Sequence, residues 1–308
     1  MAIAAAASAK SAGSGVAGWL ARTRRDGVQN SPLLALPALI FLLVFFVLPL
    51  FRMLQLSVFD PDFTLKHYAE YVEVPAYATV TAHTFLLAIT VALLCLVLGY
   101  PVAYAVNSSS PRVRRLVLIP IMLPYLTSLM VRTYAWMVLL GRTGLFNQIL
   151  GAVGIGPLKL MNNSFGVYVG MVHVLLPLMI LPLLSAMANI DRRLVLAASS
   201  LGAPPWMAFA RVFLPLSLPG IVAGTSLVFI VALGYFVTPA LLGSLENTTI
   251  SMLINEQVGI ALNWGLAATL GVVLLLATLV ALAAALLMAS MIGRALGLGE
   301  IRILGARM

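Results

Sequence analysis

The side chains that perform most enzyme chemistry are few in this sequence and do not form a recognisable site. The single cysteine, Cys95, lies within the apolar run VALLCLVLG, where it is expected to pack as a small hydrophobic residue. The three histidines, His67, His83 and His173, are scattered without the spacing of a metal site. The sequence also contains no G-x-x-x-x-G-K-[ST] phosphate loop and no Ser-His-Asp arrangement. These residues predict no catalytic site, no metal site and no bound cofactor in this chain.

Arg132 is an ionisable residue deep within an apolar stretch, and this position predicts a functional role. A guanidinium there would favour an anionic or zwitterionic ligand, such as an opine or an aminophosphonate. A structural interpretation is also open, in which Arg132 extends toward the membrane interface or binds backbone carbonyls at a broken helix. None of the nine Asp and Glu residues lies in the core of an apolar stretch, which argues against proton or sodium relay.

Aromatic residues around this arginine and late in the chain offer a different chemistry. Their rings could provide cation–π surface for an amine, and a glutamate in a late polar connection could guide a cation toward them. Tyr and Trp near the ends of spans also serve as interfacial anchors, and such a glutamate can be simply solvated or contact a partner protein. The candidates for a ligand path are Tyr125, Arg132, Tyr134, Trp136, Tyr235 and Glu256.

Composition identifies the elements that must position these residues. Hydrophobic residues make up 62% of the 308 residues and charged residues 9%, whereas soluble domains carry roughly 25% charged residues. A helix needs about 20 apolar residues to cross the hydrocarbon core of a bilayer, and six stretches reach that length. They cover residues 33–56, 77–106, 116–140, 165–188, 214–242 and 264–292. The sequence therefore predicts an all-α integral membrane protein with six transmembrane helices.

The distribution of basic residues predicts the orientation of these spans. An even number of spans places both termini on one side, and all but five of the 18 Lys and Arg residues fall on that side. The five exceptions are Arg52, Lys66, Arg132, Arg142 and Lys159. By the positive-inside rule, both termini and the connection formed by residues 189–213 are cytoplasmic. This topology accounts for the net charge of +9 without a nucleic-acid partner, for which the sequence has no motif.

The same pattern divides the chain into segments. Residues 1–31, rich in Ala, Ser and Gly, are expected to form a cytoplasmic tail, with an amphipathic transit peptide as the open alternative. Residues 32–76 hold the first span and an outer loop, residues 77–292 form a transmembrane core, and residues 293–308 form a second cytoplasmic tail. Two G-x-x-x-G pairs in the core, whose spacing allows close helix packing, are Gly166 with Gly170 and Gly220 with Gly224.

The cytoplasmic connection of residues 189–213 is unusually apolar for a loop that meets water. The residues at i, i+3, i+4 and i+7, the spacing of one helix face, are Leu194, Ala197, Ala198 and Leu201. Gly202 can end that helix in a left-handed conformation, and the proline pair after it suits the first turn of a second helix. We therefore expect a helix–Gly turn–helix, whose apolar face either lies on the membrane surface or docks on a soluble partner.

This connection resembles the cytoplasmic loop of permease subunits in binding-protein-dependent ABC importers. The family pattern is E-A-A-x3-G-x9-I-x-L-P, and the matching residues are Ala197, Ala198, Gly202, Val212, Leu214 and Pro215. Leu196 occupies the position of the family's glutamate, so the polar contacts of that glutamate do not carry over. The resemblance implies a type I (MetI-like) permease fold over about residues 77–292, in the bacterial inner membrane.

The resemblance also implies partners. In the family, the short helix of this loop sits in a cleft of an ATP-hydrolysing subunit, and two ATPases closing on ATP move two such loops together. By this resemblance the ATPase-docking residues are Leu194, Ala197, Ala198, Leu201, Gly202 and Pro215. The chain itself would be no enzyme. It would act in the lipid bilayer with a cytoplasmic ATPase dimer, a second permease chain of different sequence and a periplasmic solute-binding protein.

Two further stretches resemble spermidine/putrescine-type permeases. They are MLPYLTSLMVRTYAWMVLLGRTGLFNQIL, residues 122–150, and FVTPALLGSLENTTISMLINEQV, residues 236–258. They imply import of a polyamine, with an opine or aminophosphonate as the alternative that Arg132 suggests. A secondary carrier is disfavoured because no internal duplication and no coupling carboxylate is found. An intramembrane enzyme is disfavoured because only His83 and His173 lie within spans as candidate catalytic groups.

Overall fold

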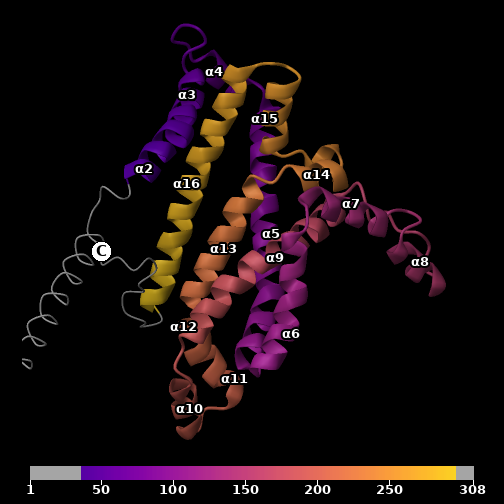
Figure 1. The fold of residues 1–308 in the computed structure, drawn as a ribbon, viewed down its shortest axis with the longest axis vertical. Coiled ribbons are helices and arrows are strands. Elements are labelled where there is room, and N and C mark those ends of the chain that lie inside the picture. The colour runs from indigo at the N-terminus through magenta and orange to yellow at the C-terminus, as the bar shows by residue number, and fades with distance from the viewer. Residues whose placement is uncertain (1–35, 296–308) are drawn as a thin grey trace, which may run out of the picture. The chain divides into compact units, whose positions relative to one another are not determined.

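The computed structural model describes residues 36–295, which fold almost entirely into helices (Figure 1). Within this range no strand forms, and the only extended pairing is an isolated bridge between Phe59 and Phe63. The predicted all-α fold class is confirmed. The predicted N-terminal tail, residues 1–31, lies outside the described range, as does most of the predicted C-terminal tail. The chain divides into two compact units, residues 1–56 and residues 57–308, and each is described by itself.

The described part of the first unit is one apolar helical segment with a π turn in its middle. Its elements are α2 (Leu36–Leu42), η2 (Leu43–Val47) and α3 (Leu48–Leu56). Together they form a 21-residue helix that is long and apolar enough to cross a membrane. None of its side chains is buried by protein, as expected for a helix that faces lipid. The predicted first span, residues 33–56, is confirmed over the described residues.

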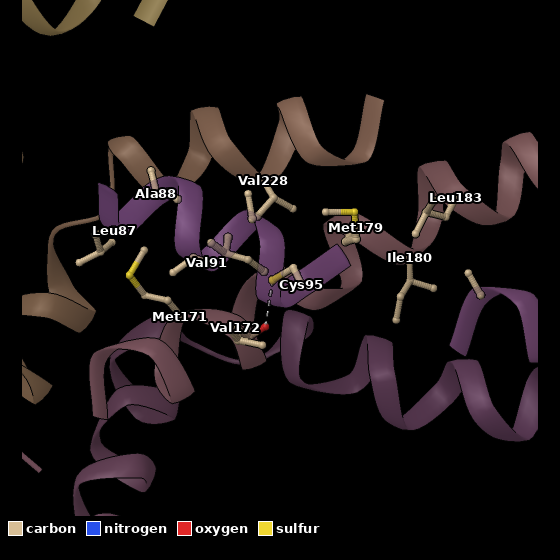
Figure 2. Packing of buried hydrophobic residues seen from close by; sticks show 14 of the residues in the cluster. Leu87, Ala88, Val91, Cys95, Met171, Val172, Met179, Ile180, Leu183 and Val228 are labelled. Atoms are coloured by element: carbon tan, nitrogen blue, oxygen red, sulfur yellow. Dashed lines mark hydrogen bonds between the residues drawn. The ribbon is translucent and has the colours of Figure 1, made fainter. Parts of the chain in front are cut away.

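Three helices form the centre of the second unit, and each packs against the other two. They are α5 (Pro75–Ser108), α9 (Ser164–Ala188) and α13 (Leu218–Leu233). The apolar side chains between them are almost completely buried, and Figure 2 shows Leu87, Val91 and Cys95 from α5 with Met179 from α9 and Val228 from α13. Cys95 therefore packs as the small hydrophobic residue that the sequence predicts.

Gly220 and Gly224 lie where α13 packs against α9, and Gly166 and Gly170 lie where α9 meets α14. A Cβ atom added to Gly220 of α13 would lie 2.5 Å from the Cβ of Ala186 in α9. A Cβ atom added to Gly170 of α9 would lie 2.6 Å from Cδ1 of Leu242, at the end of α14 (Val237–Leu242). The other glycine of each pair is similarly crowded. The prediction that both G-x-x-x-G pairs allow close helix packing is confirmed.

The last long helix, α16 (Trp264–Ala295), packs against two shorter helices at one end of the second unit (Figure 1). These are α4 (Lys66–Glu73) and α15 (Ile250–Gly259), and α15 follows the 3-10 turn η5 (Leu245–Asn247). Most apolar side chains of α16 are not buried by protein. Together with α5 and α9, α16 confirms the second, fourth and sixth predicted spans.

The predicted third span, residues 116–140, forms as a bent pair of helical segments and not as one continuous helix. The chain forms α6 (Pro111–Met122), the 3-10 turn η3 (Leu123–Leu126), α7 (Leu129–Leu140) and α8 (Leu145–Ala152). The two halves meet at a bend of 104°. Pro124 in η3 has no backbone N–H to donate, and Thr127 adopts an extended conformation. The first helical half therefore ends before Thr127, and α7 begins as a separate helix.

The predicted fifth span, residues 214–242, is also interrupted. A bend of 60° at Ser217 separates α12 (Leu214–Leu216) from α13, and α13 ends before α14 begins. The described chain thus has four helices that are long and apolar enough to cross a membrane. It has six, as predicted, only if each bent pair counts as one span.

Candidate functional site

The predicted helix–Gly turn–helix forms within residues 189–213, which we call the coupling loop. Its first helix is α10 (Arg192–Ser200), and the amides of Gly202 and of the next residue donate to the carbonyls of Ser199 and Ala198, at 3.0 and 3.1 Å. Gly202 has φ +86°, the left-handed conformation that this helix ending requires and that favours glycine. The second helix, α11 (Pro205–Ala208), begins with proline, as predicted.

The predicted apolar face of the coupling loop is open to solvent. Leu194 is 49% exposed and Leu201 is 89% exposed, while Ala197 is exposed and Ala198 half-buried. Val195, on the inner side of α10, instead packs against the hydrophobic core. The face therefore exists as a surface feature of the described chain and is available to a partner.

Pro215 occupies a different environment from the other predicted docking residues. After α11, the chain continues as the π-helix η4 (Phe209–Phe213) and then α12, in which Pro215 is half-buried. This position is immediately before the bend at Ser217. Pro215 therefore shapes the approach to α13 and does not belong to the exposed face of α10.

The coupling loop lies at one end of the second unit, with α4 and α15 at the other end (Figure 1). Arg192 of α10 donates from Nη2 to the carbonyl oxygen of Asn107, in the last turn of α5, at 3.0 Å. At the opposite end, His67 lies 2.9 Å from the carboxylate of Asp60 and contacts Gly265 of α16 so closely that no Cβ would fit there. The 34 residues of α5, at a rise of 1.5 Å each, separate these ends by about 50 Å.

Arg132 lies on α7 with much of its guanidinium group buried. Its Nε and Nη1 atoms are buried and have no hydrogen-bond partner among the described residues. Arg132 lies within electrostatic range of His173 and Tyr235, and Tyr125 lies within the same range of Tyr235. The structure thus places Tyr125, Arg132 and Tyr235 within electrostatic range of one another or of His173, and Trp136 joins this neighbourhood through its hydrogen bond to His173.

Trp136 has well-defined partners on two other helices. Its indole N–H donates to Nδ1 of His173 in α9 at 3.2 Å, and its ring stacks on Phe146 of α8 with centroids 6.2 Å apart. Sequence reasoning missed the pairing with His173, because the two residues are 37 positions apart and lie on different helices. Trp136 therefore holds α7, α8 and α9 together beside Arg132.

The two remaining candidates lie apart from Arg132. Tyr134, also on α7, is more than half exposed. Glu256 is exposed on α15 and interacts electrostatically with Tyr77, near the start of α5. The structure therefore places Glu256 at the end of the second unit that carries α4, and it places neither residue in the cluster around Arg132.

Residues 95–294 match the family model described as binding-protein-dependent transport system inner membrane component. The chain belongs to this family. It is an inner membrane component of a transport system, which confirms the resemblance that the coupling loop carries. The matched residues include α9, α13, the whole coupling loop and all but the last residue of α16.

Relatives of this family member share long stretches of its sequence. PotB of Haemophilus influenzae, a spermidine/putrescine transport system permease protein, is 36% identical over 250 residues, which are 77% of this chain and 87% of PotB. PotB of Escherichia coli is 34% identical over 214 residues, 69% of this chain and 78% of that protein. These relatives are permeases and not enzymes, so the alternatives of an intramembrane enzyme and a self-contained carrier are set aside.

A solved structure agrees with the predicted architecture. A chain of a bacterial ABC transporter involved in the import of the acidic polysaccharide alginate superposes with a TM-score of 0.72 at 19% identity. The match covers 88% of this chain and 98% of that chain. The fold is therefore that of an ABC importer permease.

Proposed function

We propose that this chain is a transmembrane subunit of an ATP-driven importer that carries a polyamine, of the spermidine or putrescine type, from the periplasm to the cytoplasm. The observation that carries the proposal is the 36% identity to a spermidine/putrescine permease over 77% of the chain. ATP is hydrolysed by a separate subunit, because this sequence has no phosphate loop. The complex also contains a second permease chain and a periplasmic solute-binding protein.

The open face of α10 is the proposed docking site for the ATPase. A fully buried leucine side chain contributes about 1.5–3 kcal/mol. Because Leu201 is 89% exposed, nearly all of this burial energy is still available for binding a partner. Leu194 is 49% exposed, so about half of its burial energy is available. Small Ala197 allows the partner to approach the backbone. Leu196 is 65% exposed, so it adds apolar area where the family pattern has an acid, and this docking surface is more hydrophobic as a result.

The charge distribution supports a cytoplasmic coupling loop. Arg192 and Arg193 begin α10, and three more arginines lie in the first turns of α6, directly after the end of α5 that Arg192 contacts. The opposite end carries Asp60, Glu70 and Glu256. Because basic residues are retained on the cytoplasmic side, we place the α10 end in the cytoplasm and the α4 end toward the periplasm.

The cluster around Arg132 is the proposed contact with cargo. The aromatic rings of Tyr125 and Tyr235 suit a passing ammonium group. Two buried, unpaired guanidinium nitrogens instead favour a ligand that brings an acceptor. For this reason a zwitterionic or anionic solute, such as an opine or an aminophosphonate, is the second candidate cargo of the same importer.

Uptake by the complete complex in proteoliposomes tests both parts of the proposal. Radiolabelled spermidine, putrescine and an opine are offered with ATP inside the vesicles, and spermidine or putrescine is expected to accumulate. Accumulation of the opine alone would replace the polyamine with the second candidate. Two variants should insert normally and abolish uptake. Gly202→Pro removes the left-handed ending of α10, and Ala198→Arg blocks the docking face.

The matched control for Ala198→Arg is Ser199→Arg, at the neighbouring exposed position outside the apolar face. It should retain uptake and bind the ATPase. Unchanged cargo-stimulated ATPase activity in the Ala198→Arg complex would contradict the docking role of this face.

A further inference from the structure

Two pairs of aromatic residues join the coupling loop to the C-terminal half of α5. Tyr100 and Tyr104 lie one turn apart in α5, and Phe209 and Phe213 begin and end η4. Tyr104 meets both phenylalanines edge-on, with ring centroids 5.3 Å from Phe209 and 5.0 Å from Phe213. Tyr100 meets Phe209 in the same way at 6.1 Å, and the two phenylalanines stack at 5.9 Å. We call these four residues the aromatic clamp.

Two hydrogen bonds fix the same joint. Arg192 of α10 donates to the Asn107 carbonyl at 3.0 Å, in the last turn of α5, where carbonyls lack partners within the helix and a cation is favoured. The fully buried Ser217 hydroxyl donates to the Leu214 carbonyl at 2.8 Å. The Tyr100 hydroxyl, 2.9 Å from the Ser217 oxygen, therefore donates to it. The coupling loop is thus attached to α5 near its start through Arg192 and at its end through Phe213, and Ser217, just beyond the loop, is bonded to α5 as well.

The covalent connection from the coupling loop to α13 is much less direct. It passes through the π-helix η4, whose wider turn is often found at functional sites. It then bends by 60° at Ser217, between two prolines that interrupt the helical hydrogen bonds. In contrast, α5 continues without a break for 34 residues and packs along both α9 and α13.

We propose that α5, and not α13, carries the motion of the coupling loop into the transmembrane bundle, with the aromatic clamp as the joint between them. The inference rests on the proposed function, because an ATPase must move the loop. Displacement of α10 and η4 pulls α5 through the clamp, and the bend at Ser217 lets α13 change its angle without following the loop rigidly. The clamp residues are positioning residues, which act on transport through α5.

The test uses the complete complex in proteoliposomes and measures spermidine imported per ATP hydrolysed. Tyr104→Ala removes the ring that contacts both phenylalanines. This variant should keep the ATPase subunit bound and keep ATP hydrolysis, and its transport ratio should fall about tenfold, a loss typical of broken coupling between sites. Tyr104→Phe keeps the ring and should keep the ratio. Val97→Ala, at an exposed position of the same helix, is the matched control and should also keep the ratio.

A double variant shows whether the loss comes from this contact. Phe213→Ala alone should lower the ratio, and Tyr104→Ala combined with Phe213→Ala should lower it no further than the larger single loss, because both remove one joint. A fall in the transport ratio of the double variant equal to the product of the two single-variant falls would overturn the proposal. So would a Tyr104→Ala complex that loses uptake and ATP hydrolysis in equal proportion, or one that no longer binds the ATPase.

Failure of the proposed function can be told apart from failure of the clamp proposal by the behaviour of the parent complex. A parent complex that imports no polyamine refutes the proposed cargo, and the same ratio measured with the solute that it does import still tests the clamp. A parent complex that binds no ATPase refutes the importer itself.

Discussion

Replacing Gly220 with alanine should destabilise the second unit by forcing α9 and α13 apart. The new Cβ would lie 2.5 Å from the Cβ of Ala186, 3.1 Å from the Pro182 carbonyl oxygen and 3.3 Å from the Cα of Leu183. Two of these atoms belong to the backbone of α9, and the third is fixed directly to it. None can rotate away as the end of a flexible side chain can, so the helices themselves must separate.

Two opposing effects set the expected change in the free energy of unfolding. Overpacking of a close-packed core costs about 1–3 kcal/mol, and the rigid neighbours place this site in the upper part of that range. Alanine regains about 1 kcal/mol over glycine inside a helix. We therefore expect Gly220→Ala to lower the free energy of unfolding by about 1–2 kcal/mol.

The matched control is Gly271→Ala in α16, where an added Cβ meets nothing within 4 Å. It keeps the helix-propensity gain without the collision, so it should leave the stability unchanged or raise it. Thermal unfolding of the purified proteins in detergent, followed by circular dichroism, compares the two. Equal unfolding temperatures for Gly220→Ala and Gly271→Ala would refute the argument that close approach of α9 and α13 limits what fits at position 220.

Two further predictions concern polar contacts outside the helical core. Asn147→Ala should cost about 1–3 kcal/mol and speed proteolysis of residues 153–163, because buried Asn147 bonds to Gly141 and twice to Leu158; unchanged cleavage would contradict this. Hydrogen bonds from His67 and Lys66 hold the pKa of Asp60 below its ordinary value. The ionised Asp60 carboxylate therefore stabilises the folded protein above about pH 4, and this stabilisation is lost as the pH falls through the folded-state pKa. Asp60→Asn should flatten the acid limb of a pH–stability curve, and identical curves would count against it.

The sequence determined those features that depend on residues close together in the chain. Runs of about 20 apolar residues predict helices that cross a bilayer, and α5, α9 and α16 form where such runs lie. The helix–Gly turn–helix of the coupling loop was equally predictable. Its apolar positions repeat at helical spacing, and Gly202 and Pro205 have conformational preferences that act locally.

Only the tertiary structure decided the bends and the contacts between distant residues. A proline in an apolar run is compatible with a continuous span, a kinked span or a broken one, so a kink near Pro124 could be expected but the size of the 104° bend could not. The pairing of Trp136 with His173 spans 37 residues, and that of Arg192 with Asn107 spans 85. No periodicity encodes such pairs, because they depend on how helices pack. The packing alone turns the coupling loop from an exposed helix into one that is fastened to α5.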